Sequence, residues 1–305
     1  MKKVVVSGAT GFIGSYLIRN LLSKDVEVYG IGTDIAKLNK MKFGYGFTPV
    51  TADFRVYNSL DKFIDDEEID IFYHLAWQGG FTSALKDYEL QFTNAQAACD
   101  AVISALNMKC HKFVFVGTVN EIEINQFMNN ERFIPRNTNI YASAKVAGDM
   151  ICRTLSYNGK MDYCSALVPL PYGIGNASPQ LINTVIKNCY TNQPSKLIKG
   201  ENQYDIAHIS DIVEALYCIG DKGVNMRSYY IGHRKLRTFK EIVSEIRDVI
   251  NPEAELRFGD YQDSLNMDYS YTNLEALYED TGFECKADFS KTIREQADWL
   301  KSIDF

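Results

Sequence analysis

Residues 3–14 read KVVVSGATGFIG, three valines followed by a loop that contains three glycines. The valines predict a buried strand, and apolar residues at 17, 18, 21 and 22 predict the helix that follows. A strand that turns into a helix through glycines brings backbone N–H groups close to an anion, with no Cβ in the way. The stretch therefore predicts a dinucleotide site. The residues expected to form it are Gly8, Thr10, Gly11, Phe12, Ile13 and Gly14.

Beyond this loop, short apolar runs alternate with helical patterns. Strands are expected at 26–31, 48–51, 69–75, 112–117 and 164–168, and helices at 94–106 and 141–156. Such alternation predicts βαβ units and a parallel sheet covered on both faces. The strand at 164–168 is expected to close the sheet. We therefore predict an α/β fold with a Rossmann-type doubly wound parallel sheet.

The second half differs from the first in its residue pattern and begins with a turn-rich stretch that contains Pro169, Pro171, Gly173 and Gly175. Helices are expected near 181–190, 209–219 and 239–250, the last with Thr238 as its N-cap. We predict a dinucleotide-binding domain at 1–168, to which the chain returns near 205–232. Residues 169–305 are predicted to be mainly a smaller, mixed α/β substrate domain.

Composition excludes several classes. The 305 residues are 46% hydrophobic and 23% charged with net charge −7, which argues against disorder and against nucleic-acid binding. No apolar run is long enough to cross a membrane, and the seven scattered cysteines suit reduced thiols. We expect a cytoplasmic protein without a metal site.

The end of the second strand decides the form of the cofactor. An acidic residue there would hold the ribose diol of NAD, but the position falls on Gly32 or Thr33, with Asp34 just beyond. The missing carboxylate and Lys37 favour NADP(H), whereas Asp34 would serve NAD(H). Asp53 and Phe54, after the third strand, are expected beside the adenine.

Tyr141 and Lys145 are four residues apart on a predicted helix, so both project from one face. An ammonium beside a phenol is expected to lower the pKa of the phenol, which suits proton exchange with a carbinol or ketone. Thr118, at the end of the preceding strand, offers a hydroxyl to the same substrate oxygen.

Taken together, these motifs resemble the extended short-chain dehydrogenase/reductases of the nucleotide-sugar epimerase/dehydratase family. The resemblance extends over nearly the whole chain. It is carried by the glycine loop, His74-Leu75-Ala76, Asn94, Thr118, Tyr141 with Lys145, Tyr172-Gly173, DIAHISD at 205–211 and Tyr230-Ile231-Gly232. It implies a bound nicotinamide cofactor, a nucleotide-sugar substrate, and a homodimer packed through helices near 94–107 and 141–156.

By this resemblance, Tyr141 exchanges the proton, Thr118 hydrogen-bonds the reacting oxygen, and Lys145 holds the nicotinamide ribose. Further cofactor contacts are expected from Leu75, Ala76, Trp77 and Asn94. Substrate contacts are expected from Gln78, Asn120 and Tyr172, and Phe81 is expected to border the site.

Departures from the family narrow the chemistry. Val119 and Asn120 follow Thr118 where the 4,6-dehydratases place an Asp-Glu pair, and Glu121 comes one place late. Neither residue supplies the Cys of enzymes that epimerise beside a ketone. Two positions that often hold Arg or Asn against the nucleotide are Leu170 and Tyr204, and Lys196, Lys199 or Arg237 could substitute for them.

Three functions remain open. The leading hypothesis is a NAD(P)-dependent sugar-nucleotide 4-ketoreductase, and the runner-up is a 4-epimerase with bound NAD. A regulator that senses a dinucleotide without turnover is a third, against which Tyr141 and Lys145 argue. His208 is expected to be a core residue on the strand that rejoins the sheet.

Overall fold

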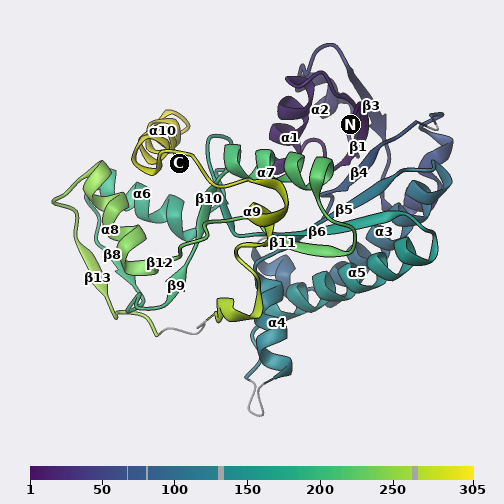
Figure 1. Cartoon of the computed structure of the whole chain (residues 1–305). Coiled ribbons are helices and arrows are strands. Elements are labelled where there is room, and N and C mark those ends of the chain that lie inside the picture. The colour runs from purple at the N-terminus through teal and green to yellow at the C-terminus, as the bar shows by residue number, and fades with distance from the viewer. Residues whose placement is uncertain (67, 80–81, 130–133, 263–266) are drawn as a thin grey trace.

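The computed structural model describes residues 1–66, 68–79, 82–129, 134–262 and 267–305. Its centre is a parallel sheet of seven strands (Figure 1). In spatial order these are β11 (Arg227–Tyr230), β6 (Asp162–Val168), β5 (Lys112–Thr118), β4 (Ile71–His74), β1 (Lys3–Ser7), β2 (Glu27–Gly32) and β3 (Phe47–Thr51). The predicted fold class, a Rossmann-type doubly wound sheet, is confirmed.

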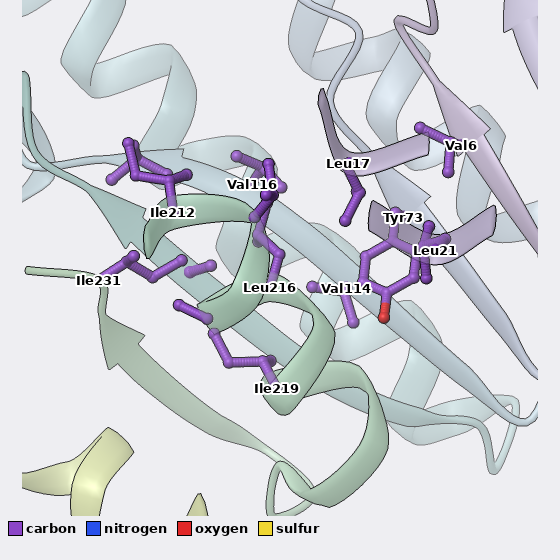
Figure 2. Packing of buried hydrophobic residues seen from close by; sticks show 14 of the residues in the cluster. Val6, Leu17, Leu21, Tyr73, Val114, Val116, Ile212, Leu216, Ile219 and Ile231 are labelled. Atoms are coloured by element: carbon purple, nitrogen blue, oxygen red, sulfur yellow. The ribbon is translucent and has the colours of Figure 1, made fainter. Parts of the chain in front are cut away.

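Helices cover both faces of the sheet, as the βαβ pattern requires. They are α1 (Phe12–Leu22), α2 (Ile35–Lys40), α3 (Tyr88–Asn107), α5 (Thr138–Asn158) and α7 (Ile209–Lys222), with short 3₁₀ helices at Phe54–Lys62 and Thr82–Lys86. A further helix, α4 (Asn120–Met128), packs against α5. Figure 2 shows the face covered by α1 and α7, where Leu17, Leu216 and Ile219 lie beside Tyr73 and Val114 of the sheet. The opposite face packs against α3 and α5.

Two expectations about the sheet are wrong. The strand at 164–168 does not close it, because β11 pairs with β6 on the far side. His208 does not lie on the strand that rejoins the sheet either. It ends β10 (Ile206–His208), which pairs with β7 (Leu170–Tyr172) in a separate small sheet, and its partly exposed ring caps α7.

The second half builds its own apolar cluster, separate from the two on the sheet. The elements that remain in the second half are α6 (Leu181–Thr191), β8 (Ser195–Leu197), β9 (Gln203–Tyr204), β12 (Arg237–Thr238), α8 (Phe239–Ile250), β13 (Leu256–Phe258), η3 (Tyr269–Tyr271), α9 (Ala276–Thr281) and α10 (Phe289–Ser302). Of these, α9 packs in the cluster of α1 and α7, and η3 lies in a further small cluster with Leu167 and Tyr230. Thr238 and Glu241 form the expected capping box at the start of α8. The division at 168/169 into two domains stays our proposal.

Candidate active site

The glycine loop between β1 and α1 has the geometry that a phosphate site needs. Gly8 has φ +74°, and a Cβ on Gly14 would lie 2.2 Å from the carbonyl oxygen of Gly8. Gly11 is the N-cap of α1 and has no side chain to offer, so the first N–H groups of the helix are left for a ligand. The pyrophosphate of a dinucleotide fits this cradle.

One cavity of about 630 Å³ extends from this loop across the carboxyl ends of the strands. It has the size of a typical ligand site. The predicted residues that line it are Gly8, Gly11, Phe12, Ile13, Gly14, Leu75, Trp77, Thr118, Asn120, Tyr141 and Lys145. The glycine loop and the expected Thr/Tyr/Lys set therefore face a single space, although they lie up to 137 positions apart in the chain.

The three catalytic candidates come from two elements. Thr118 is the last residue of β5, whereas Tyr141 and Lys145 lie one turn apart on α5. The Thr118 side chain acts on the Tyr141 hydroxyl and lowers its pKa. The Lys145 Nζ donates to the carbonyl oxygen of Val116 at 2.7 Å and lies 3.9 Å from the centre of the Trp77 ring.

The predicted effect of Lys145 on the tyrosine is wrong for this structure. Burial raises the pKa of Tyr141, with a smaller lowering by the hydrogen bond to Thr118 and a raising by Glu121. Burial also lowers the pKa of Lys145 to about 8. The ammonium is directed at Val116 and Trp77, so it does not offset the cost of burying a phenolate.

The loop after β4 is held in place by two buried amides of α3. Asn94 accepts from the N–H of Gln78 at 2.7 Å and donates to the carbonyl oxygen of Gln78 at 2.9 Å. Gln91 accepts from the indole N–H of Trp77 at 2.8 Å. Asn94 thus shapes the wall of the cavity from behind, while Trp77 faces it.

The residues expected at the adenosine end do not line the cavity. The Asp34 carboxylate caps the N-terminus of α2, where it accepts hydrogen bonds from the N–H groups of Ala36 and Lys37. Asp53 pairs with Arg55, whose side chain lowers the pKa of Asp53 to about 2. The others in this group are Thr33, which follows β2, Lys37 of α2, and Phe54, which begins the 3₁₀ helix after β3.

Four further predicted residues are not brought to the cavity wall: Thr10, Ala76, Gln78 and Tyr172. The hydroxyl of Tyr172 instead lies 2.7 Å from that of Thr292, and its ring is buried in the apolar cluster of the second half. Phe81 lies outside the described residues.

Sequence reasoning missed most of the opposite wall. It consists of residues from the second half, namely Gln180, Leu181, Ile198, Asn202, Gln203, Asp205, Phe239, Met267 and Tyr269, beside the expected departures Leu170 and Tyr204. They come from separate helices, strands and loops, and no spacing marks them as neighbours. Lys196, Lys199 and Arg237 do not line the cavity, and Arg237 pairs with Glu245.

Glu121 was also missed as a neighbour of the site. Its carboxylate is buried beneath the cavity floor and accepts from the Thr118 N–H at 2.8 Å. Within the described ranges, no group of three His, Cys, Asp or Glu side chains is arranged to hold a metal, and no helix is long and apolar enough to span a bilayer.

Comparisons with known proteins agree with this geometry. CDP-abequose synthase of Yersinia pseudotuberculosis is 25% identical over 284 residues, which cover 89% of this chain and 94% of that protein. UDP-glucuronic acid 4-epimerase of Bacillus cereus, solved with NAD, superposes with a TM-score of 0.77 at 19% identity, covering 99% of both chains.

A third relative extends the comparison to dehydratases. The dTDP-glucose 4,6-dehydratase DesIV of Streptomyces venezuelae, solved with NAD bound, gives a TM-score of 0.78 at 19% identity, with 98% of this chain and 97% of that chain covered. The model of the NAD dependent epimerase/dehydratase family matches residues 4–232. The chain is therefore an enzyme of the NAD-dependent epimerase/dehydratase family, within the extended short-chain dehydrogenases/reductases.

Proposed function

We propose that this enzyme reduces the 4-keto group of a nucleotide-activated sugar with a nicotinamide dinucleotide. The observation that carries the proposal is that Thr118, Tyr141 and Lys145 line the same cavity as the glycine loop. A hydroxyl donor, a proton-exchanging phenol and a cation are thereby collected beside a place for the cofactor. This is the set that hydride transfer to a carbonyl requires.

In the proposed mechanism, the nicotinamide ring supplies the hydride when bound. Thr118 donates a hydrogen bond to the carbonyl oxygen and orients it. The Tyr141 hydroxyl gives its proton to the same oxygen as negative charge develops there. Lys145 holds the nicotinamide ribose.

The floor of the cavity favours reduction over dehydration. Val119 and Asn120 line it after Thr118, so no carboxylate takes the place of the Asp-Glu pair expected of 4,6-dehydratases. Glu121 does not line the cavity, because its carboxylate is turned beneath the floor onto the Thr118 N–H. Removal of water from the sugar would need an acid and a base on the cavity side.

A 4-epimerase that keeps its NAD is the second candidate. It is favoured by the superposition on UDP-glucuronic acid 4-epimerase, whose chain is covered almost completely. Epimerisation at C4 uses the same hydroxyl, phenol and ammonium, with the hydride returned to the opposite face. The residues around the reacting carbon therefore serve either reaction, and only turnover separates them.

The test is to incubate the enzyme with reduced cofactor and two nucleoside-diphosphate 4-keto-6-deoxyhexoses, one with cytosine and one with thymine, and in parallel with UDP-glucuronic acid and oxidised cofactor. A reductase consumes one reduced nicotinamide for each sugar, which the absorbance at 340 nm follows. An epimerase interconverts 4-hydroxy sugars without net absorbance change, which NMR of the products detects. The absence of both reactions would overturn the proposal.

For the form of the cofactor we propose NADP(H) over NAD(H). The Asp34 carboxylate is already used by the N-terminus of α2, which weakens its claim on a ribose diol. Lys37 is exposed at the start of that helix and is available to a 2′-phosphate. The structural relatives above were solved with NAD, so the relative affinity for the two cofactors must be measured directly.

We also propose a cytoplasmic homodimer. Large apolar side chains stand exposed along α3 and α5, which is unusual for a surface that faces water. They are Tyr88, Phe92 and Ile103 of α3, and Met150, Ile151 and Tyr157 of α5. The cytoplasmic part of the proposal is supported by the seven cysteines, which are free thiols, as is usual in the cytosol. Light scattering of Phe92→Glu, with Phe63→Glu as the control, is expected to show a monomer for the first variant only.

A further inference from the structure

The strand edge beneath the catalytic residues is incomplete. β4 ends at His74, so its pairing with β5 stops at Phe115, whereas the pairing of β5 with β6 continues to Thr118. The last residues of β5, from Val116 to Thr118, therefore extend beyond the end of β4. Buried backbone groups that lose a strand partner must find another.

Two side chains of opposite charge supply the missing partners. The Lys145 Nζ donates to the carbonyl oxygen of Val116 at 2.7 Å, and the Glu121 carboxylate accepts from the N–H of Thr118 at 2.8 Å. Only Gly117 stands between these two anchor points. Lys145 and Glu121 are both buried, with 4% of each residue exposed.

Gly117 makes room for the carboxylate. A Cβ at this position would lie 2.3 Å from Oε1 of Glu121 and 3.1 Å from its carboxyl carbon. The acid therefore lies flat against the main chain of the strand, directly behind the residue whose hydroxyl faces the cavity. The close contact between this carboxylate and the main chain indicates that Glu121 helps to shape the site.

We propose that Glu121 is a positioning residue for the reaction, which fixes the main chain of Thr118 and whose protonation is coupled to that of Lys145. The inference rests on the proposed function, because it assigns Glu121 a role in that same site. Glu121 touches neither substrate nor cofactor and acts through its two neighbours.

The charges around Glu121 support this role. Burial raises the pKa of Glu121 to about 8, and the charge of Asp149 raises it further, while Lys145 and Arg153 of the same helix lower it. The charge of Glu121 in turn raises the pKa of Lys145 against the lowering by burial. It raises that of Tyr141 as well. The protonation of Glu121 is therefore coupled to that of Lys145.

The sign of the coupling gives a test that needs no substrate. In Glu121→Gln the amide oxygen still accepts from Thr118, but the negative charge is gone. The titration midpoint of Lys145, followed by NMR of ¹³C-labelled lysine in the full chain, is expected to fall by about one pH unit. Glu121→Asp keeps the charge and is expected to restore most of the wild-type midpoint.

Glu123→Gln is the matched control, since Glu123 is a buried carboxylate of the same helix that is held by Arg136. It is expected to leave the Lys145 midpoint in place while lowering thermal stability. A Glu121→Gln midpoint equal to that of the wild type would overturn the proposal, because a purely structural hydrogen bond would not move it.

The wild-type protein gives a second measurement that does not depend on folded variants. The amide proton of Thr118 is bonded to the carboxylate, so its chemical shift should move as Glu121 gains its proton and should follow the same pH range as Lys145. An amide shift that stays constant between pH 5 and pH 9.5 would contradict the proposal. Both readings are independent of whether the enzyme proves to be a reductase.

Discussion

The two walls of the cavity are built in opposite ways. On one wall the glycine loop, the ends of β4 and β5, and α5 present backbone N–H groups, hydroxyls and one ammonium. On the other, Leu170, Leu181 and Ile198 join aromatic rings from several elements of the second half. Under the proposed function, the chemistry depends on short contiguous motifs, whereas the choice of substrate depends on chain segments that only the fold brings together.

The largest expected effect falls on the chemical wall. Tyr141→Phe is expected to lower kcat about a thousandfold, because the proton donor is removed while the ring is kept. Turnover is measured with the 4-keto sugars, and cofactor affinity by nicotinamide fluorescence, which should stay as in the wild type. Full turnover in Tyr141→Phe would remove the phenol from the mechanism.

Gly14→Ala tests the construction of the same wall. The new Cβ would meet the carbonyl oxygen of Gly8 at 2.2 Å, and such overpacking is expected to lower the free energy of unfolding by about 2 kcal/mol, with loss of cofactor binding. Urea denaturation measures the first effect. Gly148→Ala is the control, since its Cβ finds its nearest neighbour at 3.6 Å; equal destabilisation in both variants would contradict the cradle.

Lys37→Glu tests whether Lys37 contributes to binding of the adenosine end of the cofactor. The change is expected to reduce the preference for NADPH over NADH about tenfold, which corresponds to about 1.4 kcal/mol. The preference is measured as the ratio of the two dissociation constants. Lys301→Glu, an equal change of charge on α10, should leave the ratio alone, and an unaltered ratio in Lys37→Glu would count against NADP(H).

The smallest effect is expected on the substrate wall. Leu181 lines the cavity and is partly exposed, so Leu181→Ser should raise KM about fivefold and leave kcat in place, as loss of uniform binding does. Ile174→Ser is the control, because Ile174 is similarly exposed on the preceding loop and does not line the cavity. A lower kcat with unchanged KM would mean that this wall takes part in the chemistry.

The contrast between the walls also explains what the sequence could predict. The glycine loop and the pair Tyr141 and Lys145 were identifiable because their spacing is imposed by one turn and one helix. The catalytic position of Thr118 followed from its place at a strand end. All of these line the cavity.

Other residues could not be placed because their environment is decided by tertiary contacts. The hydroxyl of Tyr172 forms a hydrogen bond with that of Thr292, and the carboxylate of Asp34 caps the helix that follows it. Met267 and Tyr269 reach the cavity from about 150 positions beyond Thr118, with no local pattern to reveal it. The pKa of Tyr141 depends on burial, which the spacing of two residues does not report.

The periodicity of α5, a helix of 21 residues, restricts where residues can be inserted into this enzyme or deleted from it. Each residue added to a helix turns everything beyond it by about 100°. One residue inserted between Tyr141 and Lys145 would swing the ammonium away from the strand edge, whereas loops before and after the helix can grow without that effect. Insertions and deletions in natural or engineered variants should therefore spare this four-residue interval, even where the surrounding sequence diverges freely.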